Sequence, residues 1–116
     1  MKPQLLVVLL AMNLVACVSP GHRGSTADDI AQAKASALTC TGRQAARLDD
    51  QVSEAHLVGK RVVRSCRTEW THYVRLLRPA GRRTAFMVGW YHQMEIQQRT
   101  WATQAVLLER SRQALQ

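Results

Sequence analysis

The chain has 116 residues, of which 47% are apolar, and 16 Lys and Arg against 8 Asp and Glu give it a formal charge of +8. This length fits one small domain with a thin core, and the apolar share excludes a wholly disordered chain. The basic balance favours contact with nucleic acid, lipid head groups or surface polysaccharide, or else serves solubility alone. Which of these partners the protein can meet depends on its cellular compartment.

The N-terminal segment is apolar from residue 5 to residue 16, interrupted only by Asn13, and it follows one positive charge at Lys2. Twelve helical residues rise about 18 Å, whereas the hydrocarbon core of a bilayer is about 30 Å thick. The segment is therefore too short to span a membrane comfortably, and its pattern favours a cleaved export signal ending at Ala16. The alternative is a membrane helix or a core helix in which Cys17 is a small buried residue.

The end of this segment, Leu14-Val15-Ala16-Cys17, resembles the lipobox of bacterial lipoproteins. The resemblance implies that a peptidase cuts before Cys17, which carries a diacylglyceryl thioether and is then acylated on its new amino group. Two or more acyl chains hold a protein durably on a membrane, because each buried methylene contributes about 0.8 kcal/mol. The second mature residue, Val18, is not an aspartate, which by the sorting rule of enteric bacteria implies the outer membrane, facing the periplasm.

The next stretch, VSPGHRGS, contains Pro20, Gly21 and Gly24 and no apolar period, which is typical of a tether. Helical apolar spacing begins after it, and no strand pattern or internal repeat appears. We therefore predict a signal peptide over 1–16, a lipidated tether over 17–25 and a helical domain over 26–116.

Three helices are predicted in this domain, over about 26–48, 53–77 and 84–113. The first begins at Ser25 or Thr26, because each has an aspartate three residues later. The second begins at Ser53 and has the clearest apolar stripe. That stripe is Ala55, Val58, Val62, Cys66, Trp70, Tyr73 and Leu77. The stripe of the third helix is Met87, Trp90, Met94, Gln98, Trp101, Ala105 and Leu108.

Cys40 and Cys66 remain as a pair once Cys17 is assigned to the membrane. A disulfide is the default for such a pair in an oxidising compartment. The midpoint of the pair is residue 53, at the predicted turn, so an antiparallel hairpin brings the two thiols level. Free buried thiols or a metal site are the alternatives, but no histidine stands at ligand spacing from either cysteine. The segment from 40 to 70 also resembles small exported bacterial proteins with a cysteine-bridged helical hairpin, which implies no activity.

The aromatic residues all lie between positions 70 and 101. Registering the second and third helices about the turn at residues 80 and 81 sets Trp70 opposite Trp90 and Tyr91. We therefore predict an all-α three-helix bundle, with the disulfide at one end and an aromatic cluster at the other. Core packing is preferred over a ligand box for these rings.

The second helix also has a basic face opposite its apolar stripe. Residues 60 to 83 hold eight cations against one anion, Glu69. Five cations at helical spacing define the face, and three arginines extend it: Lys60, Arg64, Arg67, Arg75 and Arg78, then Arg61, Arg82 and Arg83. Guanidinium forks match phosphate in bidentate geometry, so this face is a candidate binding surface. The alternative is a solvated face that balances an amphipathic helix.

Catalytic motifs are absent from the sequence, because it holds no glycine-rich phosphate loop, nucleophile motif or paired-histidine zinc motif. Adjacent Asp49 and Asp50 fall at a predicted turn, where aspartate forms local hydrogen bonds. Glu69 and His72 are one helical turn apart, which favours a surface pair over an acid–base device. No catalytic residue, cofactor or metal is therefore predicted.

These observations predict a non-enzymatic, lipid-anchored envelope module whose basic face binds an anionic partner. Lipopolysaccharide, anionic phospholipid and an acidic protein fit the predicted compartment, whereas nucleic acid is not an expected partner there. One alternative is an interaction subunit of an envelope secretion or conjugation complex that uses the Trp-rich third helix. The other is a small enzyme inhibitor or hydrolase.

Overall fold

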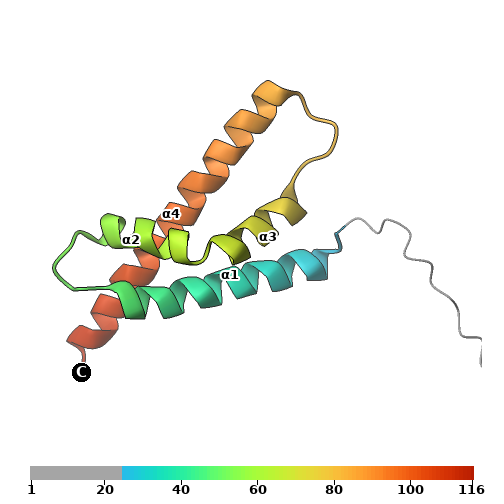
Figure 1. Cartoon of the computed structure of the whole chain (residues 1–116). Coiled ribbons are helices and arrows are strands. Elements are labelled where there is room, and N and C mark those ends of the chain that lie inside the picture. The colour runs from blue at the N-terminus through green and yellow to red at the C-terminus, as the bar shows by residue number, and fades with distance from the viewer. Residues whose placement is uncertain (1–24) are drawn as a thin grey trace, which may run out of the picture.

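The computed structural model describes residues 25–116, which form four helices and no strand (Figure 1). These helices are α1 (Ala27–Leu48), α2 (Ala55–Ser65), α3 (Arg67–Leu77) and α4 (Thr84–Ala114). The predicted all-α fold is confirmed, and the predicted second helix is divided into α2 and α3. The predicted signal peptide, Cys17 and the tether up to residue 24 lie outside the described residues. None of the four helices is long and apolar enough to cross a membrane.

The start of α1 is a reciprocal capping box between Thr26 and Asp29. The Asp29 amide donates to Thr26 Oγ1 at 3.1 Å, and the Thr26 amide donates to Asp29 Oδ2 at 2.9 Å. Two of the amides at the helix start are thereby satisfied. Of the two predicted caps, Thr26 is therefore the one used.

The turn between α1 and α2 is held by local hydrogen bonds to aspartate. Asp50 Oδ1 accepts from the amides of Val52 and Ser53 at 3.1 and 2.8 Å, and Asp50 Oδ2 accepts from Ser53 Oγ at 2.6 Å. The prediction that Ser53 caps the second helix is wrong, because its hydroxyl is bonded back to Asp50. The helix begins instead at Ala55, with Glu54 as the N-cap residue.

The break between α2 and α3 lies at Cys66, whose φ and ψ are −103° and 25°. The Cys66 amide still donates to the carbonyl of Val62, and the Cys66 carbonyl accepts from the amide of Trp70. Hydrogen bonding therefore continues while the direction of the helix changes. The change of direction lets α2 pack on α4 and α3 pack on α1.

The core consists of two clusters that follow this division. One joins α1 to α3 through Ala33, Ala37, Cys40, Cys66, Trp70 and Tyr73, and the other joins α1, α2 and α4 through Ala45, Val58, Val62, Ala102 and Val106. Cys40 and Cys66 form the predicted disulfide, with Cα atoms 5.9 Å apart. The predicted apolar stripe of residues 55–77 is confirmed, because its five central members are buried.

The predicted register of the third helix is wrong. Trp70 stacks on Trp101, with ring centroids 5.4 Å apart, and does not pair with Trp90 or Tyr91, which contact each other. No single aromatic cluster forms at the far end of the bundle, because Trp70, Tyr73 and Trp101 instead belong to the core cluster that contains the disulfide. The buried face of α4 consists of Ala102 and Val106, whereas the predicted Leu108 is 71% exposed.

The cause of this difference is the wide connection between α3 and α4. Arg78 ends α3 with ψ at 120°, Pro79 follows, and Gly81 has a φ of +66°. This connection leads the chain away from α3, so the first half of α4 diverges from it (Figure 1). The second half of α4 instead lies against α1 and α2, where small residues allow close approach.

Candidate anion-binding groove

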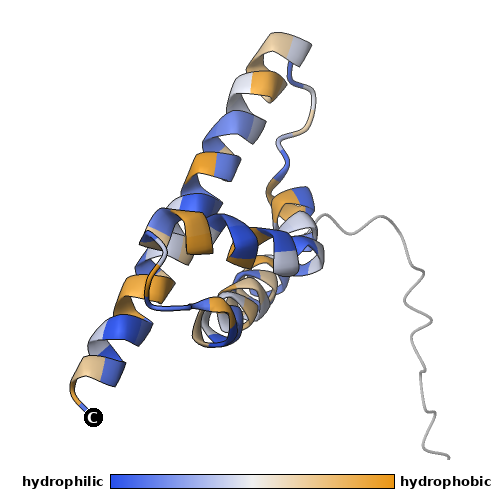
Figure 2. Cartoon of the chain, turned by 60° about the vertical axis from the view of Figure 1, so that its left-hand side comes forward, coloured by the Kyte–Doolittle hydropathy of each residue, from blue (hydrophilic) through white to orange (hydrophobic). Residues whose placement is uncertain are grey.

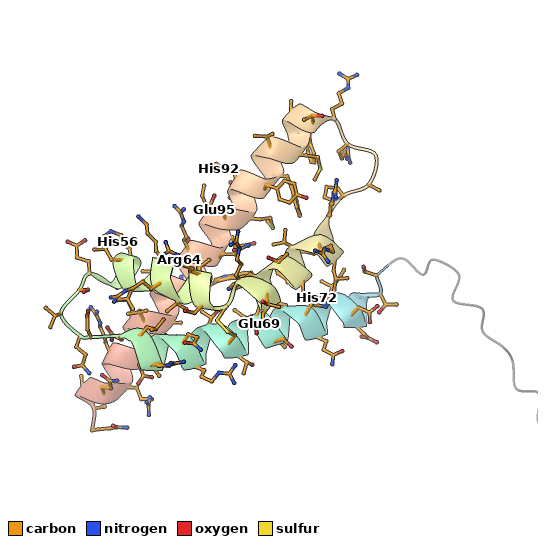
Figure 3. All side chains as sticks on the ribbon, in the orientation of Figure 1. His56, Arg64, Glu69, His72, His92 and Glu95 are labelled. Carbon is orange, nitrogen blue, oxygen red and sulfur yellow. A yellow bond between two sulfur atoms is a disulfide. The ribbon has the colours of Figure 1, made fainter. Side chains whose placement is uncertain are left out.

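A groove with a volume of about 750 Å³ lies between the α2–α3 segment and the first half of α4. It exists because α4 crosses α2 closely and then diverges from α3. Arg64 on α2 and Glu95 on α4, labelled in Figure 3, belong to its two walls. The divergence of α4 from α3 thus explains why the predicted aromatic register is wrong, and it also creates the concave surface.

The α2–α3 wall of the groove is cationic. All five residues that define the predicted basic face line it: Lys60, Arg64, Arg67, Arg75 and Arg78. Their spacing of three, four or eight residues keeps them on one side of the two helices, and Thr71 lines the groove among them. Each of the five side chains is exposed, and none forms an ion pair with another described residue.

The α4 wall adds residues that the sequence analysis did not single out. Tyr91, Glu95, Gln98 and Arg99 line the groove from this side. Arg99 Nη2 lies 2.5 Å from Glu95 Oε1 on the same helix, so the one carboxylate that lines the groove is already paired. The five cations of the α2–α3 wall therefore have no counter-charge in the groove. No sequence pattern could place this wall, because its position depends on the angle between α3 and α4.

Three arginines of the predicted basic set lie outside the groove. Arg61 is turned to the α1–α2 turn, where it pairs with Asp50 at 3.3 Å. Arg82 lies in the connection to α4, with its guanidinium 5.2 Å from the centroid of the Phe86 ring. Arg83 is the N-cap residue of α4. The structure therefore brings five of the eight predicted cations together and separates the other three.

The groove also has an apolar part between its charged walls. Val63, Trp70 and Val74 line it from α2 and α3, and Tyr91 faces them from α4. Trp70 is only 2% exposed, and its indole Nε1 has no hydrogen-bond partner among the described residues. A ligand that fits this surface combines negative charge with apolar area, because both kinds of side chain line the same space.

The carboxylates at the α1–α2 turn serve structural contacts. Arg110 Nη2 donates to Asp49 Oδ1 at 2.7 Å and to the carbonyl of Ser53 at 2.6 Å, which ties the end of α4 to the turn. The hydrogen bonds from Arg110 hold the pKa of Asp49 below its ordinary value. Hydrogen bonds from Ser53 lower the pKa of Asp50. Both carboxylates are thus held in the charged form by local partners, as expected for a turn.

Glu69, His72 and the two cysteines are the remaining polar residues that the sequence analysis considered. Glu69 and His72, both labelled in Figure 3, form no hydrogen bond or ion pair with each other. Glu69 lies near Cys40 and Cys66, but the two sulfur atoms are bonded to each other and are not free thiolates for a metal. Comparison with known proteins found no matching family model, no matching curated protein and no matching solved structure.

Proposed function

We propose that the chain is a lipid-anchored, non-enzymatic module of the bacterial envelope whose groove binds the phosphate groups of lipopolysaccharide. The observation that carries this proposal is the set of five exposed cations without ion-pair partners on one wall of the groove. A functionless solvated face would have no need of a concave surface. Here the same cations border a space of about 750 Å³.

Phosphate is the favoured partner of these side chains for geometric reasons. Four of the five cations are arginines, and a guanidinium donates two parallel hydrogen bonds to one phosphate. Cations that line one concavity also add their potentials, because the low-dielectric walls focus the field. Lipopolysaccharide carries phosphates next to apolar chains, which suits the valine and tyrosine side chains in the same groove.

The proposed anchor is Cys17, at the end of the lipobox-like segment. Supporting it are the apolar run before Cys17 and the spare cysteine that remains once Cys40 and Cys66 are paired. An anchor would hold the groove within a short distance of the membrane surface and raise its effective concentration there. We place the module on the outer membrane, facing the periplasm, as the residue after Cys17 favours.

A binding role is favoured over catalysis by the groups that line the groove. Its one carboxylate is paired with Arg99, and it holds no histidine or cysteine. Acid–base and nucleophilic catalysis most often rely on such groups, positioned and activated by a hydrogen-bonded neighbour. The side chains that line the groove instead provide positive charge and apolar area, which serve recognition.

The test is charge reversal within the groove against equal charge reversal elsewhere. The groove variant replaces Arg64 and Arg67 by Glu, and the control variant replaces Arg43 and Arg47 by Glu. Arg43 and Arg47 are exposed α1 arginines without ion-pair partners among the described residues, and they do not line the groove. Both variants change the net charge equally, so a difference between them reports position.

The measurement is lipopolysaccharide binding by the full chain held in neutral phosphatidylcholine nanodiscs. We expect the groove variant to bind at least about tenfold more weakly, because charge-assisted hydrogen bonds contribute about 1.5 to 3 kcal/mol each. The control should bind as the wild type does, and salt should weaken wild-type binding. Equal losses in both variants, or binding that ignores salt, would refute the groove as the site.

A further inference from the structure

The free end of α4 is apolar on every side. Its first turns, together with Arg82 and Arg83 just before them, are called the α4 tip (residues 82–90). The tip contains Phe86, Met87, Val88 and Trp90, and successive helical residues are turned by about 100° around the axis. These four side chains spread over about 200° of the circumference, and the small residues Ala85 and Gly89 occupy the rest. Residues 85–90 include no polar side chain at all.

No described part of the chain buries this tip. Phe86 is 49% exposed and Val88 is 66% exposed, while Met87 and Trp90 are only partly buried. The packing of α4 on α1 and α2 involves its second half, and Figure 2 shows the tip at the end of the helix that projects from the rest of the molecule. A helix that is apolar all round is normally enclosed by other apolar material.

The charge beside the tip identifies the kind of material that encloses it. Arg82 and Arg83 stand directly before the apolar turns, and no Asp or Glu occurs anywhere from residue 70 to residue 94. The Arg82 guanidinium lies over the ring of Phe86, so cation and aromatic ring occupy the same surface. This combination is typical of segments that rest in the head-group region of an anionic bilayer.

Other partners that could cover the tip are less compatible with its positive charge or its shape. A second copy of the chain would bring its own Arg82 and Arg83 to the contact, with no carboxylate between residues 70 and 94 to offset them. Residues 1–24 contain no Asp or Glu either, so they offer the tip no complementary charge. A groove on a rigid partner protein covers one side of a helix, whereas lipid surrounds a helix end whose apolar residues point in all directions.

We propose that the α4 tip inserts into the interface of an anionic phospholipid bilayer, with Arg82 and Arg83 at the lipid phosphates and Phe86, Val88 and Trp90 among the upper parts of the acyl chains. This contact is separate from the proposed lipopolysaccharide site, because none of these five residues lines the groove. It would also orient the molecule on the membrane, since α4 would point toward the bilayer.

The experiment uses fluorescence of the full chain reconstituted into vesicles whose acyl chains carry bromine, which quenches tryptophan on contact. Trp90→Phe isolates the signal of the tip, because the two other tryptophans are stacked on each other in the core. In phosphatidylglycerol vesicles we expect strong bromine quenching of the wild type and loss of that quenching in Trp90→Phe. In phosphatidylcholine vesicles we expect the quenching of the wild type to be weak. Replacing Arg82 and Arg83 by Glu should abolish it, whereas the Arg43 and Arg47 reversal should retain it.

Three results would overturn the proposal. The first is quenching that is the same in the wild type and in Trp90→Phe. The second is protection of Trp90 from quenching by aqueous acrylamide, if that protection increases with the protein density in phosphatidylcholine vesicles. Such a result would show that a second copy of the chain covers the tip. The third is quenching that persists after Phe86→Ser with Val88→Ser, two exposed positions whose replacement leaves the core intact. The Arg64 and Arg67 variant should keep the quenching, so failure of the groove and failure of the tip are told apart.

Discussion

Gly59 shows how a single residue sets the distance between two helices. A Cβ at this position would lie 2.8 Å from Thr103 Oγ1 and 3.1 Å from the Thr103 backbone nitrogen on α4. The contact involves backbone as well as side chain, so turning a rotamer cannot relieve it. Glycine is therefore required where α2 crosses α4, although it is a poor helix former. The close crossing in turn fixes the narrow end of the groove.

Gly59→Ala should destabilise the fold even though alanine favours helix. The helical gain is about 1 kcal/mol, and forcing a methyl group into a packed contact costs about 1 to 3 kcal/mol. We expect a lower urea midpoint than in the wild type. Gly42→Ala is the matched control, because a Cβ at Gly42 of α1 meets nothing within 4 Å, and it should raise the midpoint. A rise in both variants would show that α2 and α4 are less closely packed than described.

At the scale of helices, the sequence predicts well where one apolar stripe dominates. Residues 55–77 repeat apolar side chains every three or four positions, and the core is found along that line. In α4 apolar residues occur on all sides, so the sequence alone could not select Ala102 and Val106 as the buried face. The bend at Cys66 has no proline or glycine to mark it, and it follows from tertiary packing.

The candidate groove likewise has one wall that the sequence predicts and one wall that it does not. Its α2–α3 wall could be predicted from helical spacing alone, because cations on one face of a helix remain neighbours in any fold that keeps the helix. Its α4 wall depends on the path of the connection at residues 78–83, where a short turn and a wide loop are both compatible with the sequence. Arg61 shows the remaining difficulty, since a neighbouring carboxylate at Asp50 draws it away from the other cations.

Loss of the Cys40–Cys66 disulfide, which links α1 to the α2–α3 junction, should lower the free energy of unfolding by a measurable amount. Replacing Cys40 and Cys66 by Ala removes the cross-link without burying a hydroxyl group in this cluster. We expect a loss of about 3 to 4 kcal/mol in free energy of unfolding, the amount that closing a loop of this length contributes in the chain-entropy model. Chemical denaturation provides the measurement, and wild-type protein under reducing conditions should approach the variant. An unchanged midpoint would show that packing alone holds α1 to α3.

The whole molecule separates its stable part from its exposed part. Together the two core clusters use α1, α2, α3 and the second half of α4, whereas the proposed binding surfaces depend on the exposed cations of the groove and on the first half of α4. Surface substitutions in the exposed part should therefore change binding with little effect on folding. This separation is what makes the charge reversals proposed above interpretable.

The proposed membrane anchoring at Cys17 is tested by the mass of the protein. Cys17→Ser should give an unprocessed precursor that retains residues 1–16, whereas the wild type should begin at Cys17 and carry acyl groups. The Cys40 and Cys66 replacement is the control, and it should be processed as the wild type is. A wild-type mass that includes residues 1–16 without acyl groups would disprove the anchor.

The position of Cys66 has one further consequence for how the protein matures. Cys66 lies in the chain between Arg64 and Arg67, at the junction where α2 ends and α3 begins. The bond to Cys40 therefore holds the junction between these two arginines against α1. A newly made chain whose cysteines are still reduced would carry the same positive charge with the two helices free to move. Under the proposed function, formation of this bond would order the wall of cations, so anion binding would be stronger in the oxidised chain than in the reduced one.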